Sequence, residues 1–306
     1  MIAEPAPPPG GTVFDIGYRG YDGPREGRRR PRYAVFKDGL RIAFGLGRGG
    51  RAKILPFTFI ALLCLIALIM ALIAGAAERL AGPGAAQRAN LPSHGDFNAF
   101  ASMLLFAFAA LAAPEMLCRD RRDGVLSLYL VRPLTGTDYV FARWLAFLLV
   151  MVIAALLPQL ILFVGLVLGD LAPLTYLRAH WMDVPRFVAA GIAMAAYLTS
   201  LALLTASFTS RRAYASVFLV GLFAITTPFT AGVSQELPGA LGQWVSMFNV
   251  TNIPLHVNDV VFGDTTELTE SAPARQLGSA MLVGWWALTT TMATLALWTR
   301  YRRLSP

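Results

Sequence analysis

Six long apolar runs dominate the pattern of hydrophobic and polar positions along the chain. An α-helix rises about 1.5 Å per residue, so about 20 apolar residues cross the hydrocarbon core of a bilayer. The runs reach this length, and they predict an all-α integral membrane protein with six transmembrane helices. The predicted spans are residues 54–76, 97–117, 139–168, 187–208, 213–232 and 279–299.

The third span is the longest and carries a small-residue motif. It is long enough to tilt or to extend beyond the bilayer. Gly165 and Gly169 form a G-x-x-x-G pattern within it. Such spacing lets two helix backbones approach closely, so it predicts that another helix packs against this face.

Composition supports the membrane class and separates the first residues from the rest. The chain is 56% hydrophobic and only 14% charged, whereas soluble domains carry about 25% charged residues. Residues 1–35 are instead rich in Pro and Arg and contain no long apolar run. We expect them to form a basic, partly disordered segment, followed by a membrane domain over residues 36–303.

A short periodic stretch precedes the first span. Phe36, Leu40 and Phe44 recur every four residues, with Lys37 and Arg41 between them. This pattern predicts a basic amphipathic helix lying in the membrane interface, an elbow before the first span. A flexible basic linker is the alternative interpretation.

The distribution of basic residues predicts the orientation. If the N-terminus is cytoplasmic, 21 of the 26 Lys and Arg residues lie on the cytoplasmic side. The external loops then hold only Arg79, Arg88, Arg178, Arg186 and Arg275. Cytoplasmic loops are enriched in Lys and Arg, so both termini are predicted to be cytoplasmic. The high Ala, Arg and Gly content favours a bacterial source, and therefore the bacterial cytoplasmic (inner) membrane.

Residues 118–138, between the second and third spans, combine a dense arginine rim with an apolar centre. That centre, residues 124–131, is too short and too closely flanked by charge to cross a bilayer. An apolar face with a basic rim suits an acidic-rimmed groove on a partner protein, although the same arginines could bind lipid headgroups. We predict a cytoplasmic docking segment, with candidate contacts at Arg119, Asp120, Arg121, Arg122, Gly124, Leu126, Leu128, Arg132 and Pro133.

The spans carry few groups that could do chemistry. No ionisable side chain is predicted near a membrane midplane, which argues against an ion-coupled transporter or a proton pump. The pattern G-x-x-x-x-G-K-[ST] is absent as well, so this chain has no phosphate-binding loop of its own. Polar side chains within the spans could line a translocation path or could bond main-chain carbonyls. These are Ser102, Gln159, Thr199 and Thr205.

The longest predicted external loop is residues 233–278. Residues 241–248 and 253–262 are predicted to form short amphipathic helices that dip into the outer interface, with Trp244 as an anchor. The three histidines fall in external segments, each near an aspartate: His94 with Asp96, His180 with Asp183 and His256 with Asp259. His and Asp can bind zinc or copper, but no loop holds two histidines at ligand spacing, so we predict no metal site.

One stretch resembles a known family. The second span ends Ala113-Pro-Glu-Met-Leu-Cys-Arg-Asp120 and continues through Arg-Arg-Asp-Gly124, an apolar run and Pro133. The third span opens with Tyr139-Val-Phe-Ala-Arg143. This order resembles the ABC-2 type permeases, the membrane subunits of one class of ABC exporter, with Asp120 standing where that family usually has Glu. Six spans, an elbow helix and short external helices extend the resemblance from about residue 36 to residue 303.

The resemblance implies a function and partners. It implies a non-catalytic permease whose segment 118–138 seats in a cleft of a separate ATPase subunit, which binds ATP and Mg²⁺. Two ATPase chains and a second permease, identical or a sister chain, would complete the complex. The path would run between the permeases near the second and fifth spans, carrying an apolar or amphipathic drug, antibiotic, lipid or peptide outward. Membrane lipids, but no nucleic acid, are expected as further partners.

Two alternatives belong to other classes. A transmission subunit would use cytoplasmic ATP hydrolysis to change an external partner without moving a solute. The acidic external loop, residues 233–278, would be its handle. An integral-membrane enzyme would need clustered polar catalytic groups, and the sequence offers only scattered His/Asp pairs.

Overall fold

Six long helices form the body of the molecule. The computed structural model describes residues 27–46, 49–82, 84–89, 91–126, 134–237, 239–263 and 277–303, which hold helices and no strand. Six helices in this part of the chain are long and apolar enough to cross a membrane, which confirms the predicted all-α membrane fold. They are α2 (Gly50–Ala81), α4 (His94–Arg122), α6 (Gly136–Gly169), α8 (Asp183–Ala206), α9 (Arg212–Glu236) and α13 (Ser279–Arg302).

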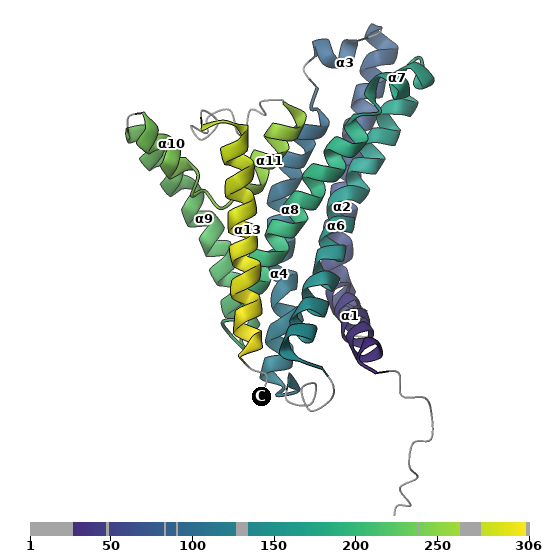
Figure 1. The fold of residues 1–306 in the computed structure, drawn as a ribbon. Helices are drawn as coiled ribbons and strands as arrows, with labels where there is room; N and C mark the ends of the chain where they lie inside the picture. The colour runs from purple at the N-terminus through teal and green to yellow at the C-terminus, as the bar shows by residue number, and fades with distance from the viewer. Residues whose placement is uncertain are drawn as a thin grey trace, which may run out of the picture.

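The helices run in one bundle with α4 and α8 at its centre (Figure 1). Helix α4 packs against α8, α6 and α9, while α8 also packs against α13. In the most apolar stretch of each helix, two thirds of the residues are buried in α4 and α8. The buried share of the same stretch is 11% in α9 and 17% in α13. The outer helices therefore present most of their apolar surface outward, as expected for helices that face lipid or another membrane chain.

Glycine and alanine bring α2 and α6 together. A Cβ atom added at Gly165 would lie 2.5 Å from Ala71 Cβ, and one added at Gly169 would lie 2.8 Å from Gly75 Cα. Both distances are shorter than a van der Waals contact, so no larger side chain fits without displacing α2. This confirms the close packing predicted from the G-x-x-x-G pattern.

Helix α1 (Arg29–Ala43) precedes the first long helix and packs on α6 and α4. It confirms a helix at the predicted elbow, but it begins seven residues before the predicted start at Phe36. The residues most buried on it are Val35, Gly39 and Ala43, because these small side chains allow close contact with α6. The predicted elbow residues Phe36, Leu40 and Phe44 are half-buried beside them and pack against the core. Residues 1–26 lie outside the described residues.

Short helices cap the other end of the bundle. They are α3 (Ala85–Arg88), α7 (Pro173–His180), α10 (Ala240–Ser246) and α11 (Ile253–Phe262). Helices α10 and α11 confirm the two short helices predicted in the loop after α9. Helix α11 also packs into the bundle, because Ile253 to Asp259 are all buried and the helix contacts α8, α13 and α4.

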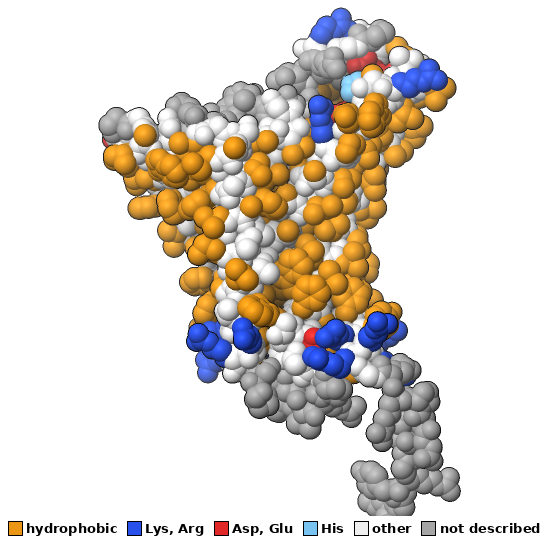
Figure 2. All heavy atoms as spheres, viewed as in Figure 1, with side chains coloured by type: hydrophobic (Ala, Val, Ile, Leu, Met, Phe, Trp, Pro, Cys, Tyr) orange, Lys and Arg blue, Asp and Glu red, His pale blue; other side chains and the backbone are white. Residues whose placement is uncertain are grey.

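Charge is distributed unevenly between the two ends. A broad band of hydrophobic side chains covers the middle of the molecule, and Lys and Arg side chains gather at the end that holds α1 and the last turn of α13 (Figure 2). The end of α4 and the start of α6 lie at the same end (Figure 1). We call this the arginine-rich end.

Candidate coupling site at the arginine-rich end

The segment predicted to dock on a partner begins and ends at well-defined helix termini. Helix α4 ends at Arg122, five residues inside the predicted segment 118–138. Gly124 follows with φ = +67°, a left-handed conformation that favours glycine and stops the helix. Helix α6 begins after Thr135, whose hydroxyl accepts the Asp138 amide while the Asp138 carboxylate accepts the Thr135 amide. The segment is therefore held at both ends.

A buried ion pair joins α4 to α6 next to the first terminus. Arg143 Nη2 lies 2.7 Å from Asp120 Oδ2, and the Tyr139 hydroxyl donates to the same oxygen at 2.7 Å. The Arg143 side chain is fully buried and that of Asp120 is 7% exposed. These contacts place a carboxylate directly beside the buried guanidinium and pair its charge.

The elbow helix completes this network. Asp38 Oδ2 on α1 lies 2.9 Å from Arg143 Nη2, so one guanidinium is shared between carboxylates of α1 and α4. Gly39 permits the approach, because a Cβ atom there would lie 2.8 Å from Ala146 Cβ. A third carboxylate anchors α1 at the other terminus, where Arg28 and Arg32 contact Asp138 at 2.8 and 2.7 Å. Helix α1 is thus tied to both ends of the docking segment.

The last helix also contacts the network. The rings of Tyr139 on α6 and Tyr301 on α13 are 5.7 Å apart, and both residues are almost fully buried. The Arg143 guanidinium lies 5.5 Å from the centre of the Tyr139 ring, a distance at which a cation is attracted to an aromatic face. Side chains of α1, α4, α6 and α13 therefore meet at one point.

The arginines of the predicted docking segment divide into two groups. Arg119 and Arg122 are exposed and pair with Asp123 at 3.6 and 3.0 Å. The hydrogen bond from Arg122 lowers the pKa of Asp123 below its ordinary value. Arg121 instead turns inward and donates to the main-chain oxygen of Ser207. Among the described arginines of this segment, Arg119 and Arg122 are therefore the two whose side chains are exposed.

The other predicted docking residues differ in accessibility. Asp120 is buried inside the bundle and paired with Arg143, so its side chain is not exposed for direct contact with a partner. Gly124 is exposed in the turn, and Leu126 is half-buried against the core. Leu128, Arg132 and Pro133 lie outside the described residues.

The predicted pathway residues all lie inside the bundle of this chain. Ser102 donates to the Ala99 oxygen at 2.6 Å, and Thr205 donates to the Ala202 oxygen at 2.8 Å. Gln159 bonds His94, and Thr199 is fully buried. Ser102 and Thr205 therefore bond main-chain carbonyls, which is one of the two roles that the sequence allowed for them. These four residues do not line a surface that a path between two chains could use.

His94 bonds a glutamine rather than the neighbouring Asp96, whereas His180 and Asp183 line one cavity as their spacing suggests. His94 Nδ1 is 2.8 Å from Gln159 Oε1, while Asp96 caps α4 by accepting from Ser93. His94 and His180 line the same cavity of about 330 Å³, although they are far apart in sequence. Among the described residues, no group of three or more His, Cys, Asp or Glu side chains is arranged to hold a metal ion.

Sequence reasoning missed the residues that connect α1 and α13 to the coupling site. Asp38, Asp138 and Tyr301 received no role, although an isolated Asp38 among the basic residues of α1 is a signal of a specific ion pair. Tyr139 and Arg143 are part of the family resemblance, and their spacing of four residues places both on one face of α6. Only the packing of α6 against α4 and α1 shows that Tyr139 bonds Asp120 and that Arg143 bonds both Asp120 and Asp38.

Comparison with known proteins places the chain in a family. A search of curated protein sequences gave no significant match. Residues 58–253, more than half of the chain, match the model of the family described as ABC-2 family transporter protein. The matched range includes the α4–α6 connection and the ion pair of Asp120 with Arg143, and it leaves out α1 and α13. The chain therefore belongs to the ABC-2 family of membrane transport proteins.

Proposed function

We propose that this chain is the permease subunit of an ATP-driven exporter in a bacterial inner membrane. A separate ATPase docks on residues 118–138 from the cytoplasm and hydrolyses Mg-ATP, and the chain itself is not catalytic. The cargo is apolar or amphipathic and moves outward. Family membership supports the permease role, and the arginine excess at one end supports its cytoplasmic placement.

The observation that carries this proposal is the double attachment of the docking segment. Its first end is bound through Asp120 to Arg143, and its second end through Asp138 to Arg28 and Arg32. Both attachments include α1, and the first reaches α13 through Tyr139. A displacement of the segment by an ATPase would therefore be passed to α1, α4 and α6 together rather than absorbed by a loose loop.

Charge defines the kind of partner surface. Arg119 and Arg122 are 47% and 67% exposed at the end of α4, and their nearest acid, Asp123, is itself exposed. An acidic-rimmed groove on the ATPase matches this surface. With one docking segment per permease, two ATPase chains serve a pair of permeases.

A second permease chain is supported by the outward apolar surface of α9 and α4. Val217, Phe218 and Ile225 on α9 are 70%, 61% and 68% exposed, and Met103 on α4 is 77% exposed. Helix α9 leans away from α13 toward its α10 end (Figure 1). We assign this surface to a second permease, identical or a sister chain, with the transport path between the two.

The first test is affinity purification of the full chain in mild detergent, followed by mass spectrometry of the proteins that accompany it. We expect an ATPase with a phosphate-binding loop in about equal amount. The double charge reversal Arg119→Glu/Arg122→Glu should release it while leaving membrane insertion intact. The matched control is Arg178→Glu, an exposed arginine on α7 at the opposite end, which should retain the ATPase.

A chain that purifies alone and stays stable contradicts the proposal, and so does equal loss of ATPase in the control. Transport is measured separately in inverted vesicles that contain the complex. ATP-dependent accumulation of a fluorescent amphipathic dye supports an exporter. ATP hydrolysis by a complete complex without accumulation of any of a panel of apolar and amphipathic probes favours the transmission subunit instead.

A further inference from the structure

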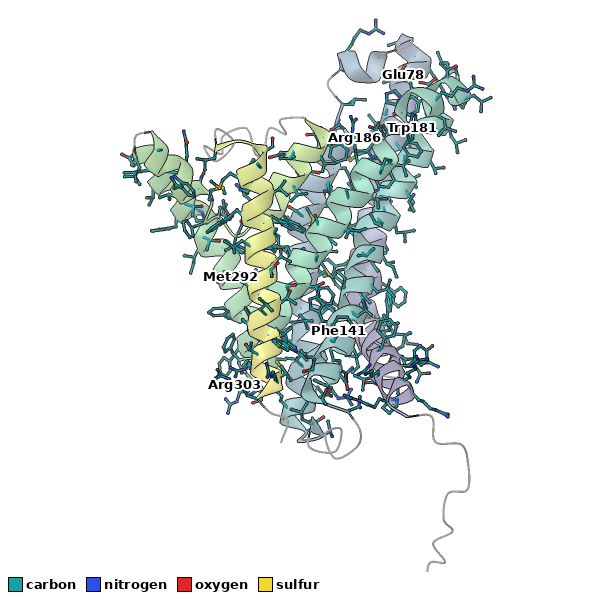
Figure 3. The ribbon with its side chains drawn as sticks, viewed as in Figure 1. Glu78, Phe141, Trp181, Arg186, Met292 and Arg303 are labelled. Carbon is teal, nitrogen blue, oxygen red and sulfur yellow. The ribbon has the colours of Figure 1, made fainter. Side chains whose placement is uncertain are left out.

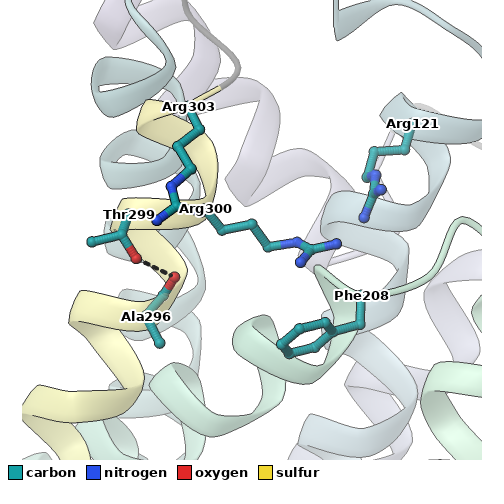
Figure 4. Close-up of a pocket in the computed structure, with 6 residues that line it drawn as sticks. All are labelled: Arg121, Phe208, Ala296, Thr299, Arg300 and Arg303. Atoms are coloured by element: carbon teal, nitrogen blue, oxygen red, sulfur yellow. Dashed lines mark hydrogen bonds between the residues drawn. The ribbon is translucent and has the colours of Figure 1, made fainter.

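A pocket of about 400 Å³ opens at the arginine-rich end between the last turns of α4 and α13 and the α8–α9 turn. The residues that line it are Arg121, Phe208, Ala296, Thr299, Arg300 and Arg303. Arg300 extends from α13 toward Phe208 and Arg121 (Figure 4). Three of the six lining residues are arginines and none is acidic, so the pocket carries a concentrated positive charge.

Two of these guanidinium groups share one neutral acceptor. Arg300 Nε donates to the Ser207 oxygen at 3.0 Å, and Arg121 Nη1 donates to the same oxygen. A carbonyl dipole orients two like charges but does not neutralise them. The nearby carboxylates of Glu115 and Asp120 are directed to Arg212 and Arg143. The site therefore favours a bound anion.

Arginine and aromatic chemistry together narrow the class of anion. Guanidinium groups bind phosphate oxygens through paired hydrogen bonds. Phe208 is 63% exposed beside them, and the Arg300 guanidinium lies 4.5 Å from the centre of its ring. A phosphate that lies next to an exposed aromatic ring at a membrane boundary is typical of a lipid headgroup.

An apolar stripe of α13 leads away from the pocket. Leu288, Met292 and Leu295 are 49%, 60% and 51% exposed, and their spacing puts them on one helix face with the pocket residue Thr299. Figure 3 shows Met292 partway along α13 and Arg303 at its end. A ligand with a phosphate and a long acyl chain fits both features, whereas free phosphate would use only the first.

We propose that this pocket binds the phosphate of an anionic phospholipid, whose acyl chain lies along the Leu288–Met292–Leu295 stripe. The bound lipid joins α4, the α8–α9 turn and α13 at one point. Helix α13 has few buried side chains, namely Leu282, Leu297 and Tyr301, so the lipid adds to a weakly packed helix. The proposed lipid site requires neither transport nor a bound ATPase. The same contacts would form whichever leaflet of the membrane this end of the bundle faces.

The test uses the purified full-length chain in mild detergent. Thermal unfolding and native mass spectrometry are compared after adding dioleoylphosphatidylglycerol, dioleoylphosphatidylcholine or inorganic phosphate. We expect the phosphatidylglycerol to be retained at least about tenfold more than the phosphatidylcholine and to raise the Tm. Arg121→Gln/Arg300→Gln should abolish this preference. Arg303→Gln, at an exposed position, should weaken it about tenfold even if the double variant fails to fold.

The matched control is Arg302→Gln, which removes the same charge from the same helix. Arg302 lies 5.3 Å from the centre of the Trp298 ring and does not line the pocket. Its preference for phosphatidylglycerol should be unchanged. Equal retention of both lipids, an equal loss in the control, or the same Tm increase from inorganic phosphate alone would each overturn the proposal.

Discussion

The two ends of the bundle are held together by different chemistry. At the arginine-rich end, Arg143 is fully buried between Asp120 and Asp38. At the opposite end, neutral amides join α11 to α4. Asn258 accepts from Asn98 at 3.0 Å and donates to the Gly95 oxygen at 3.2 Å. The ion pairs of the arginine-rich end surround the point where α4 ends and α6 begins, whereas neutral side chains join α4 to α11 at the opposite end.

This difference has energetic consequences. Removal of one member of a buried ion pair leaves an uncompensated charge and costs about 3–5 kcal/mol. Loss of a hydrogen bond between neutral groups within a membrane bundle costs about 1 kcal/mol. The stability of the arginine-rich end therefore depends more strongly on its buried contacts. This is the end at which we propose that an ATPase acts.

The largest expected effect comes from Asp120→Asn. Without the carboxylate, the half-exposed Asp38 is the one acid among the described residues that still pairs with the buried Arg143, and the free energy of unfolding should fall by about 3 kcal/mol. Denaturant unfolding in detergent measures it. Asp123→Asn, an exposed pair member, is the control and should change stability by less than about 1 kcal/mol. Equal losses would remove the distinction between buried and exposed pairs.

A smaller loss is expected from Gly39→Ala. The new Cβ would lie 2.8 Å from Ala146 Cβ, and overpacking of this kind costs about 1–3 kcal/mol. Gly284→Ala on α13 is the matched control, because no atom lies within 4 Å of its added Cβ. There the better helix propensity of alanine should maintain or increase the thermal stability. If both variants unfold at the wild-type temperature, α1 does not pack closely on α6.

At the opposite end, Asn258→Ala should cost about 2 kcal/mol, because two neutral hydrogen bonds of about 1 kcal/mol each are lost but no charge is left buried. Thermal unfolding checks the value. Asn252→Ala, at the start of α11, is the control because its side chain makes no capping bond. A loss as large as that of Asp120→Asn would show that the neutral end depends on its partners as strongly as the charged end.

The smallest effect is expected from Arg28→Gln/Arg32→Gln. Both side chains are about half exposed where they meet Asp138, and exposed pairs contribute about 0–1 kcal/mol and weaken with salt. Unfolding measured at low and high salt should show the wild-type advantage shrinking as salt rises. An advantage that does not change with salt would mean that these contacts are not electrostatic.

Much of the fold followed from local pattern, because each feature needs only neighbouring residues. The six spans, the α10 and α11 helices and the close approach at Gly165 and Gly169 were all predicted. One boundary was wrong for a physical reason: α1 begins at Arg29 rather than Phe36, since charged residues can form a helix when their ion-pair partners lie on another helix. The burial of α11 against α8, α13 and α4, with Asn258 bonded to Asn98 on α4, depends on distant helices that a periodicity pattern does not show.

The sequence by itself determined the membrane class, the number of spans, the charge asymmetry and the resemblance to ABC-2 permeases, because apolar length and basic residues act one segment at a time. Only the tertiary structure decided that Asp120 faces Arg143 rather than a partner, that Asp38 and Asp138 tie α1 to the docking segment, and that Arg121 and Arg300 meet at Ser207. These contacts join helices that are distant in the chain, and they form only when the helices pack. Their identity therefore depends on which faces meet, and this information is spread over the whole bundle.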